Sequence, residues 1–306
     1  MEKSLVIGAA GQIGTELVSE LRSKRGIANV IAADLRVDNL ASPFYELDAT
    51  NESALRDLVL NEGVTEIYHL VAILSATGEK APKRAWELNM KTLLNILDLA
   101  KERIIQRVFW PSSIAVFGPS TPKIKTPQFT VMDPNTVYGI SKSAGELWCQ
   151  YYFENYGVDV RSIRYPGLIS WKTMPGGGTT DYAIEIFHSA RKGIDFRSFL
   201  GPDTRLPMMY MDDAVRATIE IMEADPDSIK IRTSYNLSGV DFTPRELFDE
   251  IKKIYPEFNI TFKPDSRQKI ADSWPGSIDD SEAKLDWGWN HKFDTKAIVK
   301  LMSDNI

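Results

Sequence analysis

Apolar and polar positions divide the first 165 residues into short apolar runs separated by longer amphipathic segments. The apolar runs predict buried strands at residues 4–7, 30–33, 67–71, 107–110 and 158–163. Apolar positions at helical spacing predict helices at 13–21, 52–60, 82–101 and 137–156. Strands that alternate with helices in this way are parallel and joined by right-handed crossovers. The pattern therefore predicts an α/β fold with a doubly wound parallel sheet.

The pattern changes after Pro166. The elements expected there are a loop at 175–178, a helix at 181–191, a strand at 208–211, a helix from a cap at Asp212 to about residue 222, a strand at 234–237, a helix from the capping box of Thr243 and Glu246 to about residue 254, and a last helix after Asp294. We predict a nucleotide-binding domain at 1–165 with return segments near 208–240, and a smaller α/β substrate domain at 166–306.

Composition narrows the class of protein. The 306 residues are 43% hydrophobic and 25% charged, which is ordinary for a globular chain. The net charge of −6 and the absence of a basic block argue against nucleic-acid binding. No apolar run reaches the roughly 18 residues that cross a bilayer, and the first residues do not resemble a signal peptide. Cys149 is the one cysteine, so we expect no internal disulfide and a cytoplasmic, non-membrane protein.

A glycine-rich turn lies between the first predicted strand and the first predicted helix. Its glycines are Gly8, Gly11 and Gly14, with Gln12 and Ile13 between the last two. Such a strand–turn–helix unit, typical of Rossmann folds, lets a pyrophosphate approach the backbone at a helix N-terminus. Asp34 ends the second strand, where its carboxylate can accept both ribose hydroxyls and repel a 2′-phosphate. The unit therefore favours NAD over NADP. Leu35 follows Asp34 in the sequence, and the nearby Arg36 is the one residue that argues against NAD.

Candidate catalytic residues gather around the fourth strand and the helix at 137–156. Tyr138 and Lys142 are four residues apart, so they share one helix face. A cation near a phenol stabilises the phenolate and lowers the pKa of the tyrosine toward working pH. Ser112 and Ser113 follow the fourth strand, at the carboxyl edge where open α/β sheets bind ligands. The spacing alone is also compatible with an exposed helix pair.

The chain resembles the extended short-chain dehydrogenase/reductase family through its GxxGxxG turn, its segment from His69 to Ala72 and its Asn89-Met90-Lys91-Thr92 segment. The resemblance implies that Asp48 contacts adenine and that Leu70 to Ala72 line the nicotinamide ribose, while Asn89 helps to hold the central fold. The full set of cofactor residues implied is Gly8, Gly11, Gln12, Ile13, Gly14, Asp34, Leu35, Arg36, Asp48, Ala49, Leu70, Val71, Ala72, Asn89, Tyr138, Lys142, Tyr165 and Leu168.

Ser113, Tyr138 and Lys142 look like the catalytic triad of this family. The segment 111–118, Pro-Ser-Ser-Ile-Ala-Val-Phe-Gly, matches its serine motif and favours Ser113 over Ser112 as the triad serine. The resemblance implies that Ser113 binds the substrate hydroxyl and that Tyr138 removes its proton. Lys142 then holds the nicotinamide ribose and lowers the pKa of the tyrosine, and hydride passes to the cofactor.

The substrate signature departs from that of nucleotide-sugar enzymes. The run Arg164-Tyr165-Pro166-Gly167 lacks their asparagine, and the segment 206–213 lacks their arginine. Three segments, at 165–170, 175–182 and 203–211, closely resemble the short-chain type of L-threonine 3-dehydrogenase. That family oxidises the 3-hydroxyl of L-threonine with NAD to 2-amino-3-ketobutyrate, a step of threonine catabolism.

A small zwitterion suits the polar residues near the second domain. Backbone N–H groups of the glycines up to Gly178 can bind a carboxylate, and Thr179 and Thr180 add hydroxyls. Asp181 can pair with the ammonium group or merely cap the next helix. The substrate candidates are Ser75, Ser112, Ser113, Tyr138, Gly178, Thr179, Thr180, Asp181 and Trp274, the last of which is also a candidate core residue.

No metal site is expected, because His69, His188 and His291 are isolated along the chain. Two other functions remain open: another enzyme of the extended branch, such as a nucleotide-sugar epimerase or dehydratase, and a non-catalytic NAD-binding regulator. The intact triad argues against the regulator. The family usually dimerises through two helices per subunit. We therefore expect a homodimer formed by the helices at 82–101 and 137–156, with apolar surface from Leu93, Leu94, Ile96 and Leu97.

Overall fold

A six-stranded parallel sheet forms the centre of the computed structural model, which describes residues 2–36, 41–173 and 176–306. The strand order is β3-β2-β1-β4-β5-β7. From β1 at the centre, the chain adds β2 and β3 on one side of the sheet and then β4, β5 and β7 on the other side. The strands are β1 (Ser4–Ile7), β2 (Val30–Asp34), β3 (Phe44–Glu46), β4 (Glu66–His69), β5 (Arg107–Phe109) and β7 (Asp159–Arg161). The predicted doubly wound α/β fold is confirmed.

Register brings the functional turns to one edge of this sheet. Ile7 of β1 pairs with Ala33 of β2 and with His69 of β4. The chain therefore leaves all three strands at the same level, and the residues that follow them lie side by side. This is the carboxyl edge at which open α/β sheets bind ligands.

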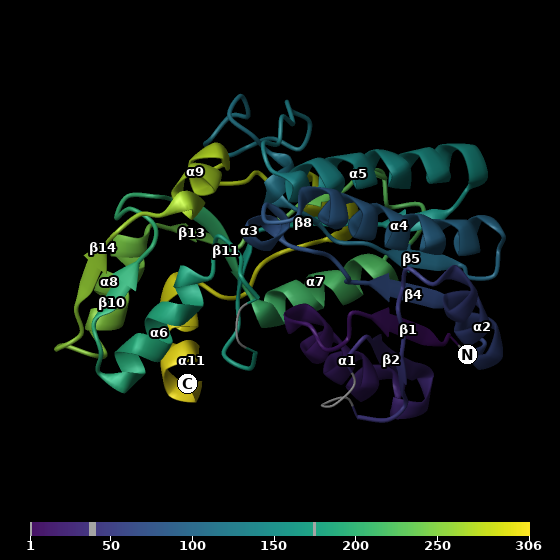
Figure 1. Ribbon diagram of the computed structural model, residues 1–306, viewed down its shortest axis with the longest axis horizontal. Helices are drawn as coiled ribbons and strands as arrows, with labels where there is room; N and C mark the ends of the chain where they lie inside the picture. The colour runs from purple at the N-terminus through teal and green to yellow at the C-terminus, as the bar shows by residue number, and fades with distance from the viewer. Residues whose placement is uncertain (1, 37–40, 174–175) are drawn as a thin grey trace.

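Helices cover both faces of the sheet (Figure 1). On one face α1 (Gln12–Arg25) packs against α7 (Met211–Glu223), and on the other α4 (Pro82–Lys101) packs against α5 (Val137–Tyr156). The helix α2 (Glu52–Glu62) packs into the apolar core on the face covered by α4 and α5, through Leu55, Leu58 and Val59. Each fully buried leucine or isoleucine in these two cores contributes about 1.5–3 kcal/mol. Because helices cover both faces of the sheet, the side chains on both faces of each strand are buried. The strands therefore carry apolar residues at successive positions.

Three small sheets connect this part to the C-terminal part. They are β12-β8-β6, β13-β11-β9 and β10-β14. Their strands are β6 (Ser112–Ser113), β8 (Ile163–Tyr165), β9 (Gly167–Ile169), β10 (Phe196–Ser198), β11 (Leu206–Tyr210), β12 (Tyr235–Asn236), β13 (Val240–Phe242) and β14 (Ile260–Phe262). The C-terminal helices α6, α8 and α11 pack around a separate apolar core, at the far end of the molecule from the N-terminus (Figure 1).

The remaining elements are short or close the C-terminal part. The helices are α3 (Ser75–Gly78), α6 (Tyr182–Lys192), α8 (Pro244–Lys252), α9 (Ser266–Ser273), α10 (Ser281–Trp287) and α11 (Thr295–Asn305), with 3-10 turns η1 (Ile27–Asn29) and η2 (Ile114–Val116). In the described part of the chain, no helix is both long enough and apolar enough to span a membrane.

Three details differ from the sequence prediction. The strand expected at 158–163 is two strands, because the backbone leaves the large sheet at Ser162 and joins the β6 sheet as β8. The strand expected at 67–71 ends at His69, which places Leu70 and Val71 in the following loop. Asp212 does not cap α7, because the helix already begins at Met211 with Tyr210 as its N-cap residue. The capping box of Thr243 and Glu246 is confirmed.

Candidate active site

The glycine turn has the shape that a dinucleotide cofactor requires. Gly8 has φ of 87°, a left-handed conformation that favours glycine. A Cβ on Gly14 would lie 2.2 Å from the Gly8 carbonyl oxygen and 2.7 Å from the Ala9 Cα, so α1 can approach the turn only with glycine there. The backbone thus forms a tight cradle at the start of α1.

Unpaired donors face this cradle. The first N–H groups of α1, at Gln12, Ile13 and Gly14, have no partner within the helix, as at any helix start. The side-chain nitrogen Nε2 of Gln12 is buried and has no hydrogen-bond partner among the described residues. A buried donor without a partner is costly, and a pyrophosphate oxygen would satisfy it. These groups therefore fit NAD at this turn.

Asp34 lies at the end of β2 beside the turn. Its carboxylate accepts hydrogen bonds from the backbone N–H of Ala10 at 3.0 Å and of Arg36 at 3.2 Å. These two bonds fix the carboxylate at the sheet edge, where a ribose would lie. Leu35 is exposed beside it, as expected of a residue at the rim of a cofactor site.

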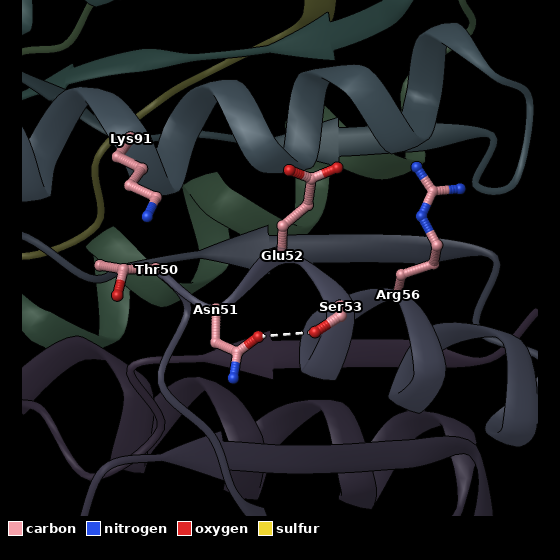
Figure 2. Close-up of a pocket in the computed structure, with 6 residues that line it drawn as sticks. All are labelled: Thr50, Asn51, Glu52, Ser53, Arg56 and Lys91. Atoms are coloured by element: carbon pink, nitrogen blue, oxygen red, sulfur yellow. Dashed lines mark hydrogen bonds between the residues drawn. The ribbon is translucent and has the colours of Figure 1, made fainter.

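Asp48 and Ala49 follow β3 at the next corner. The Asp48 carboxylate accepts from the Thr50 N–H and hydroxyl, and both bonds lower the pKa of this carboxyl. The Ala49 carbonyl accepts from Asn95 of α4 at 3.0 Å. A groove of about 640 Å³ opens here between the start of α2 and Lys91, lined by Thr50, Asn51, Glu52, Ser53, Arg56 and Lys91 (Figure 2). None of these lining residues belongs to the predicted catalytic set.

The loop after β4 packs against the glycine turn. A Cβ on Gly8 would lie 3.1 Å from the Leu70 carbonyl carbon and from the Val71 nitrogen. Asn89 of α4 accepts from the Ile73 N–H at 2.8 Å and donates to the Ser141 hydroxyl at 3.1 Å. This asparagine therefore ties the loop that carries Leu70, Val71 and Ala72 to α5.

Ser113, Tyr138 and Lys142 meet at the carboxyl edge. Thr136 caps α5 by accepting from the Gly139 N–H, which fixes the first turn that carries Tyr138. The Ser113 hydroxyl, which accepts from the Ala115 N–H at 3.2 Å, lies near enough to Tyr138 to lower the pKa of its phenol. The Lys142 nitrogen lies 5.6 Å from the centre of the Tyr138 ring, and Lys142 is only 3% exposed. The three residues named from the sequence are thus brought together from β6 and α5.

The electrostatics of this group differ from the sequence expectation. Burial raises the pKa of Tyr138 to about 12, although the nearby Ser113 hydroxyl lowers it. Burial also lowers the pKa of Lys142 to about 7, while Cys149 and Glu146 raise it. In this structure Lys142 therefore does not bring the pKa of Tyr138 below its usual value. Desolvation dominates, and the Lys142 amine donates to the Pro111 carbonyl at 2.5 Å.

Ser112 is turned away from this group. Successive residues of a strand point to opposite faces. The Ser112 hydroxyl donates to the Glu146 carboxylate at 2.6 Å, and Ser112 is 2% exposed. The sequence left Ser112 open as a substrate contact, but here its hydroxyl is bound to a buried carboxylate. Ser113 alone faces Tyr138.

The candidate substrate residues form two neighbouring groups. Ser75 at the start of α3 and Thr179 are both buried, with their hydroxyl oxygens 3.4 Å apart. Asp181 is the N-cap residue of α6, but its side chain makes no capping hydrogen bond to that helix. Its carboxylate instead accepts from the Gly177 and Gly178 N–H groups, at 2.9 and 2.6 Å. Burial raises the pKa of Asp181 against these two bonds. Pro175, part of the same predicted loop, lies outside the described residues.

Three other predicted residues pack with core residues. Tyr165 is buried, with its hydroxyl against Thr218 of α7. Leu168 of β9 packs on the core between α1 and α7. Trp274 is 7% exposed and belongs to the C-terminal apolar core, which favours its reading as a core residue. The methyl group of Thr180 packs against Gly167. A Cβ added to Gly167 would lie 2.7 Å from the Thr180 methyl carbon.

Sequence reasoning missed two buried polar residues next to the triad. Glu146 is 0% exposed and His69 is 1% exposed. Burial, with a contribution from Lys142, lowers the pKa of His69 to about 3, so its ring is neutral. The spacing of Glu146, four residues after Lys142, placed it on the catalytic face of the helix. Nothing in the pattern distinguished it from a solvent-exposed glutamate.

Comparison with known proteins shows similarity over the whole chain. The model of the NAD dependent epimerase/dehydratase family matches residues 4–238. A curated protein of Staphylococcus saprophyticus, described as an uncharacterized epimerase/dehydratase, is 47% identical over 100% of this chain and 97% of its own length. The holo structure of a GalE-like L-threonine dehydrogenase from Cupriavidus necator has a TM-score of 0.98 and 54% identity, covering 99% of each chain. The apo structure of a monomeric L-threonine 3-dehydrogenase from a metagenome has a TM-score of 0.95 and 48% identity, covering 99% of this chain and 98% of its own.

Proposed function

The chain belongs to the NAD dependent epimerase/dehydratase family, and on that premise we propose that it oxidises the 3-hydroxyl of L-threonine with NAD. The product would be 2-amino-3-ketobutyrate, which would place the protein in threonine catabolism. The observation that carries the proposal is the meeting of Ser113, Tyr138 and Lys142 beside the glycine turn, in a chain similar over its full length to L-threonine dehydrogenases.

The chain's own residues divide the work. Ser113 donates to the alcohol oxygen of the substrate and holds it against Tyr138. Tyr138 takes the hydroxyl proton. Lys142 holds the cofactor ribose. When bound, oxidised NAD supplies the hydride acceptor and a positive charge that favours the phenolate. Gln12 and the first N–H groups of α1 hold the pyrophosphate, and Asp34 holds the adenosine ribose.

A zwitterion would bind where Asp181 and the glycine N–H groups now satisfy each other. Threonine carries an ammonium group that matches the Asp181 carboxylate and a carboxylate that matches the N–H groups of Gly177 and Gly178. Exchange of this internal pair for the two substrate charges keeps every polar group paired. The hydroxyls of Ser75 and Thr179 supply further contacts.

Reduction of NAD by L-threonine tests this function directly. Purified protein, NAD and L-threonine at mildly alkaline pH should give rising absorbance at 340 nm with a chelator present. L-serine, D-threonine and NADP run as parallel reactions and should give little or none. Absence of the signal with L-threonine, together with tight binding of a UDP-sugar, would move the assignment to nucleotide-sugar chemistry.

We propose the same division of the chain that the sequence predicts, with residues 1–165 for the cofactor and 166–306 mainly for the substrate. The helix α7 supports a returning segment near 208–240, because it packs on α1 within the cofactor-binding core. The C-terminal part has its own core around α6, α8 and α11. A cytoplasmic location stays a prediction of the sequence.

We also propose a homodimer through the two helices expected, but with other residues at the surface. Leu93, Ile96 and Leu97 are fully buried in the core and Leu94 is partly buried against it, so they offer little surface. An exposed apolar stripe instead runs along α5 at Ile140, Leu147, Trp148 and Tyr151, with Trp86 of α4 also exposed. The spacing of these α5 residues places them on one helix face, as in a helix-pairing seam.

Light scattering of the full chain at micromolar concentration should therefore give the mass of two chains. Leu147→Glu puts a charge into the stripe and should shift the mass to one chain. Leu60→Glu is the matched control, because Leu60 of α2 is similarly exposed, at 56% against 58% for Leu147. A single-chain mass for the unaltered protein would refute the dimer.

A further inference from the structure

A buried ion pair lies directly behind the catalytic residues. Glu146 of α5 and Arg164 of β8 are 0% and 3% exposed. The arginine binds both carboxylate oxygens, with Nε to Oε1 at 2.9 Å and Nη2 to Oε2 at 2.7 Å. This two-bond geometry fixes the position of the carboxylate as well as its charge.

The pair is anchored on every side. Arg164 also donates to the Gln128 carbonyl and to Asn236 Oδ1, both at 3.0 Å, and its guanidinium lies 5.3 Å from the Phe117 ring centre. Ser112 pairs with Arg164 in the β6–β8 register and donates to Glu146. The carboxylate therefore holds the strand that ends in Ser113.

Glu146 also faces Lys142. Tyr138, Lys142 and Glu146 follow one another at intervals of four residues, on one face of α5. The other groups around the Lys142 amine are uncharged: the buried thiol of Cys149, the neutral ring of His69, the Trp110 ring at 4.4 Å and the Pro111 carbonyl. Arg164 forms an ion pair with Glu146, and its positive charge acts on the Lys142 amine in the opposite direction to the Glu146 carboxylate.

Resting on the proposed function, we propose that Glu146 is a positioning residue for the oxidation: its carboxylate turns Ser112 away so that Ser113 meets Tyr138, and it keeps the neighbouring Lys142 amine charged. One side chain can serve both roles because Glu146 lies between β6, which carries Ser112 and Ser113, and Lys142. The arginine makes the arrangement possible, because its ion pair offsets the cost of burying the carboxylate.

Titration of Lys142 tests the second role without substrate. In protein labelled with [13C]lysine, the Cε resonance of Lys142 is identified by its loss in Lys142→Met. In Glu146→Gln the midpoint of this resonance should move to lower pH by about one unit, since the negative charge that favours the ammonium is gone. Glu146→Asp keeps the charge and should restore most of the midpoint. Glu154→Gln, the same change at the exposed end of α5, should leave it unchanged.

Kinetics then test the consequence for the reaction. Glu146→Gln should lower kcat/KM for threonine by about tenfold where Lys142 is losing its proton, and the limb of the pH profile that Lys142 governs should move to lower pH. If Glu146→Gln does not fold, the double change Glu146→Gln with Arg164→Gln removes both buried charges and should move the midpoint in the same direction by a smaller amount, because the loss of the arginine charge partly offsets the loss of the carboxylate. A Lys142 midpoint that stays in place, or an equal loss of activity at every pH, would overturn the proposal. Failure of the unaltered protein to oxidise threonine would reject the proposed function, while the Lys142 titration would still decide the role of Glu146.

Discussion

Tyr138→Phe is expected to lower kcat for threonine oxidation by about 10³-fold, because in the proposed mechanism it removes the atom that takes the substrate proton. The ring keeps its packing against the C-terminal core, so the fold is retained. The lost contact with the Ser113 hydroxyl should lower the melting temperature by no more than about 5 °C. Turnover is measured at 340 nm with saturating NAD and threonine, and NAD affinity, measured by titration, should change little.

Tyr255→Phe is the matched control for this change. It removes the same phenol oxygen from the C-terminal part of the chain, where the Tyr255 hydroxyl donates to the Ser303 carbonyl at 3.4 Å. Its activity should equal that of the unaltered protein. Full turnover by Tyr138→Phe would be incompatible with the proposed mechanism, in which the Tyr138 phenol oxygen takes the substrate proton.

Arg161→Met is expected to lower the free energy of unfolding by about 3–5 kcal/mol. Arg161 is fully buried at the end of β7 and donates to carbonyls at the C-terminal end of α7, those of Ile221, Met222 and the C-cap residue Ala224. Methionine fills much of the same space but removes this donor from the Ile221 and Ala224 carbonyls, while the Met222 carbonyl keeps its bond from Arg107. The arginine charge also stabilises the negative end of the helix dipole. Urea unfolding followed by circular dichroism measures the loss.

Arg56→Met provides the contrast on the surface. Arg56 makes two bonds to Glu102, at 2.6 and 2.8 Å, but both side chains are partly exposed to water. Its replacement should lower the free energy of unfolding far less than Arg161→Met does, because water screens an exposed ion pair. Equal costs at the two positions would show that burial of the helix end is not what makes Arg161 important.

The periodicity of the sequence was sufficient for the architecture. It predicted α4 and α5 with the bounds that the structure has, because long amphipathic helices repeat their signal over many residues. It did not predict β6, a strand of two residues, or the departure of the chain from the large sheet at Ser162. Strands this short carry too few positions for a pattern, and their pairing depends on segments far away in the chain.

The candidate site divides in the same way. Glycines in a turn and a Tyr–Lys pair on one helix are local features, so the sequence by itself predicted the cofactor cradle and placed Tyr138 and Lys142 on one face, while the family resemblance supplied their expected roles and the choice of Ser113. Only the tertiary structure decided the direction of the Ser112 hydroxyl, the pairing of Asp181 with the glycine N–H groups, and the raised pKa of Tyr138. Each depends on burial or on a partner from another segment, such as Glu146, which is 34 residues away from Ser112. A sequence specifies which groups a chain carries and how neighbours along it are spaced, whereas desolvation and long-range partners arise only once the segments are packed together.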